Sequence, residues 1–570
     1  MDRNSNNRFA HVPQVELQRS RFEINHTHKT TFSAADCIPI FWDEILPGDS
    51  VTMDMGAAIR MSTPIFPVMD NAYIDFYAFF TPNRLIWEHW KEFLGENNTT
   101  AWEQETEYAV PHIKAPEGGW QKGTVADYLG VPTKISNITA NALPFRAYAE
   151  IWNNWFRDQN LKQPALVNHG DADVDGENFP AEETDASYVT NAQLGGAPLK
   201  AAKFHDLFTS ALPSPQKGPD VLIPLGGVSG TIPVVGDGVL GITNGAANIG
   251  YLTNYNASNT NYARYFYNLD ASNTSLPELG TTDASGTGST NFGALGVSSS
   301  PDNSGLIAIA GQGGYNNNST INQLRMAFAM QRFYERQARG GTRYREILKN
   351  MFGVTTSDAR MQIPEYLGGF RKHINMDQVL QTSATNETSP QGNAAAFSLT
   401  SFADNVFTKS FEEHGILMIL AVVRHDNTYQ QGLNKKFQRR DKFSYFWPSL
   451  ANIGEQPLRV SEIYATGTEA DEETFGFQEA WAEYRYHPNM VTGAFRSNYE
   501  QSLDAWHYAD YYTDQPILSS QWIDATKNSI DRTLAVQSSL EDQFIADFEF
   551  RSFYTRAMPI YSVPGLIDHY

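Results

Sequence analysis

The segment AYIDFYAFF, residues 72–80, has the alternating pattern of a β-strand and sets the expected fold class. Successive side chains of a strand point to opposite faces of its sheet. One face of this segment carries Ile74, Phe76, Ala78 and Phe80, and the other carries Tyr73, Asp75, Tyr77 and Phe79. Because aromatic residues occupy both faces, we predict a strand that is covered on both sides.

A second segment, GILMILAVV at residues 415–423, is the longest strongly apolar run in the chain. It has less than half of the roughly 20 residues that a helix needs to cross a bilayer, so we predict a buried strand. The first 22 residues lack the apolar core and the cleavage site of a secretory signal. We therefore expect a protein made in the cytosol of its producing cell.

Short apolar segments broken by proline and glycine surround both strands, in residues 31–81 and again after Gly341. Helical patterns are fewer, and we predict helices at residues 84–93, 146–161 and 321–337. No repeat with a period of 20 to 50 residues is evident, which argues against a solenoid or a propeller. The pattern predicts a mainly β protein, an antiparallel sandwich with long insertions.

Residues 165–319 differ from the rest, because glycine, asparagine, serine and threonine dominate and periodicity nearly vanishes. Residues 165–320 contain 14 acidic and four basic residues. A loop this long inside a compact domain is normally functional or disordered. We predict a large surface-exposed insertion between two helices of the β-rich domain.

The whole chain is also acidic, with 42 Lys and Arg residues against 64 Asp and Glu residues and a net charge of −22. This sign excludes a protein that wraps nucleic acid with its whole surface, so any contact with nucleic acid must be local. The single cysteine, Cys37, excludes an intramolecular disulfide framework and a zinc site made of several thiolates. We expect Cys37 to be a small buried residue.

The motifs of common enzymes are weak or absent. Gly236, Gly238 and Gly241 match the spacing of a dinucleotide-binding fingerprint, but the sequence after them, ITNGAANIG, predicts no helix to hold a pyrophosphate. The sequence contains no G-x-S-x-G, phosphate-loop or H-E-x-x-H pattern. We expect neither an enzyme nor a bound cofactor.

One acidic segment has the spacing of a calcium loop, with Asp171, Asp173, Asp175 and Glu182 as its four candidate ligands. Gly176 stands where such a loop turns, but a polar asparagine replaces the usual apolar residue and no exit helix is expected. We favour a solvated acidic loop and keep a calcium site as the alternative.

Residues 435–447, KKFQRRDKFSYFW, combine basic and aromatic side chains. Single-stranded nucleic acid is bound by such mixtures, because cations neutralise phosphate and aromatic rings stack on bases. The candidate genome-facing residues are Lys435, Lys436, Arg439, Arg440 and Lys442. A subunit interface in which arginines pair with carboxylates is the favoured interpretation and contact with a genome the alternative.

Many segments together resemble the major capsid proteins of the Microviridae, in particular the gokushovirus branch. They occur in the family's order and leave mainly residues 165–319 unmatched. Among them are SRFEINHTHKTTF, LPGDS, TPIFPVMDN, DFYAFFTPNRLIW, WFRDQNL, ERQARGGTRYREILKNMFGV, SDARMQIPEYLGG, EHGILMILAVVRHDNTYQQG, FGFQEAWAEYRY and MPIYSVPGLIDHY.

The resemblance implies a major capsid protein with an eight-stranded antiparallel jelly roll, a few helices and long insertions. Its copies are expected to form a T=1 icosahedral shell around a circular single-stranded DNA genome. The expected parts are an N-terminal arm (1–30), a first part of the jelly roll (31–164), an insertion forming a threefold protrusion for host attachment (165–319), and a helix with the second part of the jelly roll and a C-terminal arm (320–570).

Assembly requires large contacts between copies of the chain. Candidates are the residues of the RGGTRY loop, whose glycines permit close backbone approach. They are Arg339, Gly340, Gly341, Arg343 and Tyr344.

The expected partners are other copies of the chain, packaged single-stranded DNA, a small basic DNA-binding protein, a minor pilot protein, a scaffold protein and a bacterial surface receptor. The basic protein is expected because a chain of net charge −22 cannot by itself neutralise packaged DNA. The chain is expected in the virion, and in the host cytoplasm during synthesis and assembly. A secreted glycan-binding protein or hydrolase and a phage fibre protein are alternatives, but neither accounts for the ordered motifs.

Overall fold

The computed structural model describes residues 18–97, 106–181, 191–221, 320–383 and 394–561, with short stretches between them. The chain divides into two compact units, Met1–Gly218 with Tyr334–Tyr570, and Pro219–Phe333. It is mainly β with several antiparallel sheets, which confirms the predicted class.

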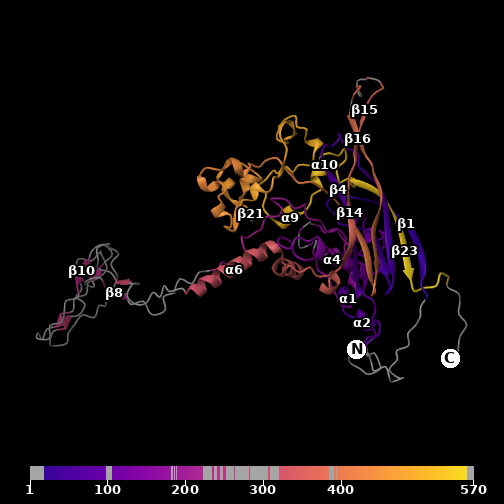
Figure 1. The fold of residues 1–570 in the computed structure, drawn as a ribbon, viewed down its shortest axis with the longest axis horizontal. Coiled ribbons are helices and arrows are strands. Elements are labelled where there is room, and N and C mark those ends of the chain that lie inside the picture. The colour runs from indigo at the N-terminus through magenta and orange to yellow at the C-terminus, as the bar shows by residue number, and fades with distance from the viewer. Residues whose placement is uncertain are drawn as a thin grey trace. The chain divides into compact units, whose positions relative to one another are not determined.

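The first unit contains two four-stranded antiparallel sheets (Figure 1). The first has the order β1-β23-β3-β17, formed by β1 (Ser20–Phe32), β23 (Phe544–Arg556), β3 (Ser50–Met61) and β17 (Thr400–Ser410). The second has the order β14-β4-β18-β2, formed by β14 (Glu365–His373), β4 (Ala72–Pro82), β18 (Gly415–His425) and β2 (Ile38–Ile45). Each sheet therefore combines strands from both halves of the chain.

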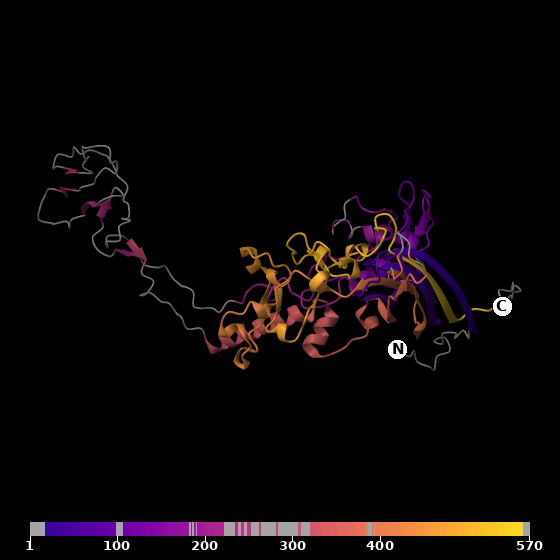
Figure 2. The same cartoon turned by 90° about the horizontal axis from the view of Figure 1, so that it is seen from above.

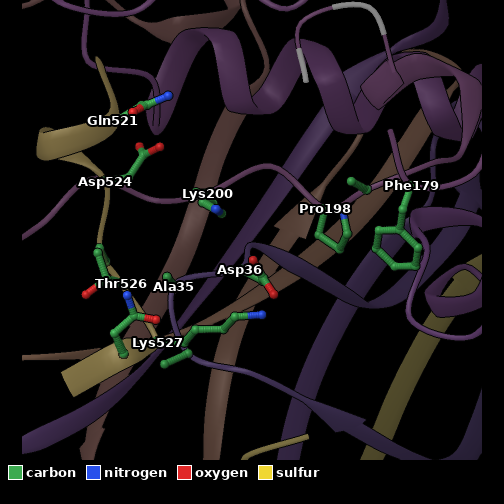
Figure 3. Close-up of a pocket in the computed structure, with 13 residues that line it drawn as sticks. Ala35, Asp36, Phe179, Pro198, Lys200, Gln521, Asp524, Thr526 and Lys527 are labelled. Atoms are coloured by element: carbon green, nitrogen blue, oxygen red, sulfur yellow. The ribbon is translucent and has the colours of Figure 1, made fainter. Parts of the chain in front are cut away.

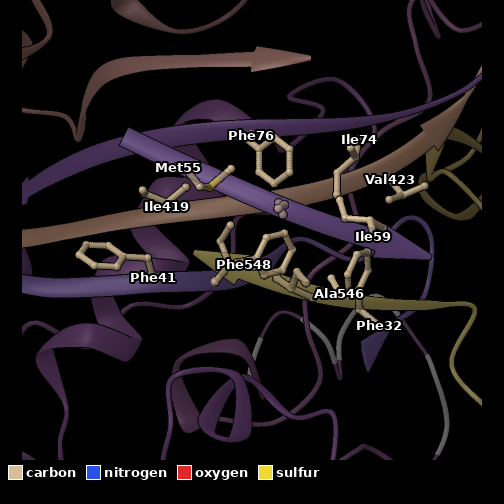
Figure 4. Packing of buried hydrophobic residues seen from close by; sticks show 14 of the residues in the cluster. Phe32, Phe41, Met55, Ile59, Ile74, Phe76, Ile419, Val423, Ala546 and Phe548 are labelled. Atoms are coloured by element: carbon tan, nitrogen blue, oxygen red, sulfur yellow. The ribbon is translucent and has the colours of Figure 1, made fainter. Parts of the chain in front are cut away.

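Strand β4 is covered on both faces, as its alternating sequence predicts. Ile74 and Phe76 belong to a buried cluster that also contains Met55 and Phe548 of the other sheet (Figure 4). On the opposite face, Phe79 belongs to a second buried cluster that includes helix α4 (Leu143–Trp155). The strand thus lies between the core of the sandwich and a helical cover.

Strand β18 pairs with β4 in the second sheet and is also covered on both faces. Residues 415–423 are all buried. Leu417 and Ile419 face the core between the sheets, whereas Ile416 and Met418 face α4. The predicted buried strand is confirmed. None of the helices that the structure describes is long and apolar enough to cross a membrane.

The predicted helices are present with altered bounds. The pattern at 146–161 corresponds to α4, which begins three residues earlier and ends at Trp155. The pattern at 84–93 is divided into α1 (Asn83–Ile86) and α2 (Trp90–Phe93), because the buried Trp87 between them has an extended backbone. The third helix, α6 (Ile321–Gly340), continues three residues beyond the predicted end at residue 337.

Shorter elements connect these sheets. The strands are β5 (His112–Lys114), β6 (Thr139–Asn141), β7 (Val174–Asp175), β15 (Met376–Leu380), β16 (Ala394–Ser398), β19 (Thr428–Tyr429), β20 (Glu455–Arg459), β21 (Thr474–Glu479) and β22 (Asn489–Met490). The helices are α3 (Val125–Tyr128), α7 (Tyr344–Ile347), α8 (Asp358–Met361), α9 (Ser520–Ile523), α10 (Asn528–Asp531) and a π-helical turn, η3 (Leu348–Phe352). The 3₁₀ turns are η2 (Ala192–Leu194), η4 (Lys435–Phe437), η5 (Lys442–Ser444), η6 (Pro448–Leu450), η7 (Val460–Glu462), η8 (Glu469–Glu472), η9 (Ala482–Tyr484), η10 (Gly493–Phe495) and η11 (Asp504–Trp506).

Within Pro219–Phe333 the structure describes three antiparallel strand pairs and the first part of α6. The pairs are β8 (Val234–Gly236) with β13 (Leu306–Ala308), β9 (Gly241–Thr243) with β10 (Asn248–Tyr251), and β11 (Tyr262–Ala263) with β12 (Thr281–Thr282).

The excursion between β18 and β23 has a small core of its own. Leu458, Ile463 and Phe475 pack there with Phe208 and Tyr429. Figure 2 shows the orange part of this excursion to one side of the strands of the two sheets. The basic and aromatic segment 435–447 is attached to the same excursion by the Arg439–Glu483 ion pair and by Phe446, which packs against Trp481.

Candidate assembly and nucleic-acid surfaces

The acidic loop is held against the fold by its own carboxylates. Asp171 Oδ1 accepts hydrogen bonds from Trp87 Nε1 at 2.7 Å and pairs with His89 Nδ1 at 2.9 Å. Asp173 accepts a hydrogen bond from the backbone N–H of His112 at 2.8 Å. Burial alone would raise the pKa of Asp171, but the hydrogen bonds from Trp87 and His89 outweigh it and lower that pKa. Two of the four candidate calcium ligands therefore already have protein partners.

Asp175 is exposed at the end of the short strand β7, and Glu182 lies outside the described residues. Among the residues that the structure describes, no three His, Cys, Asp or Glu side chains lie close enough together to hold a metal ion. The calcium site stays a prediction, since its fourth ligand is not described.

The RGGTRY loop is bound tightly within its own chain. Arg339 forms ion pairs with Glu455 and, at 3.3 Å, with Glu479. The Glu455 side chain is only 1% exposed. Gly341 has a φ of +91°, a left-handed backbone conformation that residues other than glycine rarely adopt. A β-carbon at Gly340 would collide with the side chain of Asn350. Both glycines are therefore explained by local geometry.

Arg343 also has intramolecular partners. Its guanidinium donates to the carbonyl oxygens of Asn153 at 2.8 Å, in the last turn of α4, and of Arg157 at 3.1 Å, just beyond the end of that helix. Burial lowers the pKa of Arg343, and Glu346 opposes that shift. Tyr344, by contrast, is 65% exposed. Of the five assembly candidates, the tyrosine offers the most surface to another molecule.

The basic and aromatic segment 435–447 contains two 3₁₀ turns, each capped by a polar side chain. The Asn434 side chain accepts a hydrogen bond from Lys436 N at the start of η4, and Asp441 accepts from Phe443 N and Ser444 N at the start of η5. These hydrogen bonds, the one from Ser444 above all, lower the pKa of Asp441. Local capping therefore determines how the segment presents its side chains.

The five basic candidates of this segment differ in their surroundings. Arg439 is nearly buried, pairs with Glu483 at 3.1 Å and lies over the rings of Tyr445 and Tyr484. Lys436, Arg440 and Lys442 are exposed, and Lys435 is half-buried in η4. The large apolar side chains of the segment are exposed too, namely Phe437, Phe443, Tyr445, Phe446 and Trp447.

A pocket of about 240 Å³ opens beside this segment. Lys435, Arg439 and Phe443 line it from the segment, and Arg459 and Trp481 line it from the sequence that follows. The last two residues could not be predicted from the sequence, because nothing in the spacing of the chain relates them to residues 435–447. Tertiary contacts bring them together, among them the Arg439–Glu483 ion pair and the contact of Phe446 with Trp481.

Two other pockets carry mixed charge. One of about 370 Å³ is lined by Asp36 and Asp524 as well as Lys200 and Lys527 (Figure 3), and Asp524 pairs with Lys162 at 2.6 Å. Another, of about 220 Å³, contains Glu462 and Glu483 together with Lys435 and Arg496. In both, acidic and basic side chains balance one another.

The remaining sequence predictions concern Cys37 and the glycine motif. Cys37 is fully buried, as predicted, and burial raises the pKa of its thiol. Gly236 ends β8 and Gly241 begins β9, whereas Gly238 lies outside the described residues.

Comparison with known proteins is informative over almost the whole chain. Residues 10–566 match the family described as Capsid protein (F protein). The chain is 39% identical to Capsid protein VP1 of Bdellovibrio phage phiMH2K over 586 residues, which covers 100% of this chain and 99% of that protein. It is 39% identical to Capsid protein VP1 of Spiroplasma virus 4, with 98% and 97% of the two chains covered. It is 36% identical to Capsid protein VP1 of Chlamydia phage 1, with 98% of each chain covered.

Proposed function

The chain belongs to the Capsid protein (F protein) family of the Microviridae, and we propose that it assembles into a T=1 icosahedral shell around a circular single-stranded DNA genome. It is a major capsid protein of a single-stranded DNA phage, a structural component of the virion and not an enzyme. The observation that carries the proposal is the match to viral capsid proteins along nearly the full length of this chain and of each relative.

The strand order supports a jelly roll as the shell-forming fold. Numbered one to eight along the chain, the long strands have the orders 1-8-3-6 and 5-4-7-2 in the two four-stranded sheets. The first and last strands pair, and the first four strands alternate between the sheets. Two antiparallel sheets connected in this way are what a double Greek key requires.

Electron microscopy of the purified full-length chain tests the assembly proposal. We expect spherical particles of uniform size, with size-exclusion chromatography showing one early peak. A chain that stays monomeric under all salt conditions, even with the phage's own scaffold protein present, would overturn it.

We propose the insertion as the host-attachment protrusion at the threefold axes. Its acidic, glycine-rich composition suits an outer surface and is unsuitable against packaged DNA. The beginning of the predicted range, 165–319, contributes Ala165, Leu199 and Ala201 to the buried cluster beneath α4. Within that range we propose residues 219–319, which belong to the second compact unit, as the protrusion itself. Replacing 222–319 by a short glycine-serine linker should leave particles intact and abolish adsorption to host cells, whereas unchanged adsorption would exclude the role.

The other parts of the chain are proposed to serve assembly. The jelly-roll halves at 31–164 and 320–570 form the shell, and the terminal segments act as arms that reach neighbouring copies. Within the proposed N-terminal arm, 1–30, residues 20–30 pair with β23 of the same chain. The described part of the arm is therefore integrated into the first sheet.

Two surfaces are proposed to make functional contacts. The RGGTRY loop contacts neighbouring copies through Tyr344, its exposed residue, while Arg339 and Arg343 hold the loop in shape. The basic segment with Lys435, Lys436, Arg439, Arg440 and Lys442 faces the genome. Because the chain has a net charge of −22, a small basic protein is proposed to neutralise most of the packaged DNA. A pilot protein, a scaffold and a bacterial receptor complete the proposed partners.

A further inference from the structure

The pocket beside residues 435–447 differs in charge from its surroundings. Three cationic side chains line it, Lys435, Arg439 and Arg459, and none of the described residues in its lining is acidic. The other lining side chains are two aromatic rings and neutral groups. Arg439 pairs with Glu483 at 3.1 Å and Arg459 with the exposed Glu472 at 3.6 Å, and neither acid lines the pocket. In a chain with a net charge of −22, a lining with cations and no acid favours an anionic ligand.

Arg439 offers a donor that the protein leaves unused. Its side chain is 9% exposed and pairs with Glu483 through Nη2. Its Nε–H is buried and has no hydrogen-bond partner among the residues that the structure describes. Because a buried donor without a partner is unfavourable, a small movement of the Arg439 side chain that exposes Nε–H to the pocket would let it donate to an acceptor such as a phosphate oxygen.

The pocket also has aromatic walls. Phe443 lines it and is 62% exposed; Lys442 Nζ lies 5.0 Å from the centre of its ring, and the part of the ring that remains exposed is available for stacking. Trp481 lines it from the opposite segment with a φ of +64°, a left-handed conformation that is unusual for a bulky residue. Such backbone strain tends to be retained where it serves function. Cations beside open ring faces are the combination that binds single strands.

We propose that this pocket binds one unpaired nucleotide of the packaged single-stranded DNA. The phosphate lies among Lys435, Arg439 and Arg459, and the base stacks on Phe443. The inference rests on the proposed capsid function and names the part of the chain that contacts the genome. It requires a single strand, because the face of a base in a duplex is already covered by its neighbours.

The test uses the purified full-length chain before assembly and a fluorescent oligothymidylate, with affinity measured by anisotropy at several salt concentrations. Phe443→Ala should weaken binding by about 5- to 150-fold, the range for losing one stacked base. Lys435→Ala and Arg459→Ala should each reduce the salt slope by about 0.7, the value for one phosphate contact on a single strand.

Two matched controls lie outside the pocket. Lys91→Ala removes the same charge from an exposed position in α2, and Phe437→Ala removes the same ring from the segment itself; neither residue lines this pocket. Both variants should bind nearly as tightly as the unchanged chain. With an oligonucleotide that carries abasic sites, Phe443→Ala should no longer weaken binding, whereas Lys435→Ala should still weaken it. This comparison separates recognition of the base from recognition of the phosphate alone.

Equal losses of affinity for the oligonucleotide in the pocket variants and the control variants would overturn the proposal in favour of diffuse charge attraction. Failure of the unchanged chain to bind the oligonucleotide while it still forms particles would overturn the pocket alone and leave the capsid function standing. Pocket variants that bind DNA normally and fail to form particles would assign the surface to a subunit interface instead.

Discussion

The carboxylate of Asp75 lies 2.6 Å from Nη2 of Arg424, on the neighbouring strand of the same sheet. Arg371, on the strand at the other side, donates to the same carboxylate at 2.5 Å. Asp75 is 2% exposed, and both guanidinium groups lie over the ring of Phe204. One buried acid therefore joins β14, β4 and β18 on the face of the sheet opposite the sandwich core.

We predict that Asp75→Ala lowers the free energy of unfolding by about 3–5 kcal/mol, because two guanidinium groups lose their shared counter-charge. Chemical denaturation followed by tryptophan fluorescence measures the change. The control is Asp547→Ala, which removes a 3.2 Å pair with Lys29 whose side chains are 47% and 70% exposed. That exposed pair should contribute at most about 1 kcal/mol. Equal effects of the two substitutions would refute the structural importance of Asp75.

The RGGTRY loop allows folding and assembly to be separated. Arg339→Ala leaves the buried carboxylate of Glu455 without its ion pair and should cost about 1–3 kcal/mol of stability. Tyr344→Ala changes an exposed side chain, so we expect an unchanged unfolding midpoint and a reduced yield of particles in electron microscopy. A normal particle yield from Tyr344→Ala would place this residue outside the interface.

Stability should depend on the protonation of His507. This side chain is 3% exposed; its Nδ1 accepts a hydrogen bond from Ala509 N at 3.0 Å, and its Nε2 lies 2.7 Å from the carbonyl oxygen of Phe495. Burial lowers the pKa of His507, the Phe495 carbonyl partly opposes this shift, and Arg532 adds to it. The unfolded chain therefore takes up a proton first, at a pKa of about 6.5.

The contribution of His507 to stability is complete above the unfolded pKa and declines as the pH falls below it toward the folded pKa. We expect thermal melting temperatures to fall between about pH 7 and pH 5, and His507→Gln to flatten that dependence. His205→Gln, at an exposed position, should leave the dependence as it is. An identical pH profile for both variants would exclude His507 as a source.

The acidic loop should stabilise the fold without calcium. We expect the addition of about 1 mM Ca²⁺, enough for weak protein sites, to leave the melting temperature unchanged. Asp173→Ala should cost about 1 kcal/mol, because the His112 N–H loses its acceptor. Asp175→Ala should cost less, since no hydrogen bond to its side chain is found among the described residues. A rise in melting temperature with calcium that Asp173→Ala removes would instead support the calcium site.

The two decisive strands could be predicted because each is buried on both faces. Phe76 and Phe79 of β4 occupy opposite clusters, and the apolar run in β18 contributes alternately to the same two clusters. Burial on both faces leaves a local signature, an apolar pattern with few charges. Helix bounds were less exact, since the division at Trp87 depends on tertiary packing of that side chain.

The candidate sites were predicted less completely. The acidic spacing from Asp171 to Asp175 suits calcium in sequence, yet the side chains of Asp171 and Asp173 accept hydrogen bonds from residues about 60 to 85 positions away. The basic segment was evident from composition alone. Its pocket was not, because Arg459 and Trp481 come from later elements.

The sequence by itself determined the mainly β class, the two buried strands, the acidic insertion and the family, because each depends on the order of residues along the chain. Only the tertiary structure decided which charges remain available to partners. The sequence does not distinguish Arg339, Arg343 and Arg439 from exposed cations. In the structure each of them has intramolecular partners from elements distant in the sequence. Pairing is a property of distances in space, and residues far apart along the chain acquire those distances only when the sheets and the small core have formed.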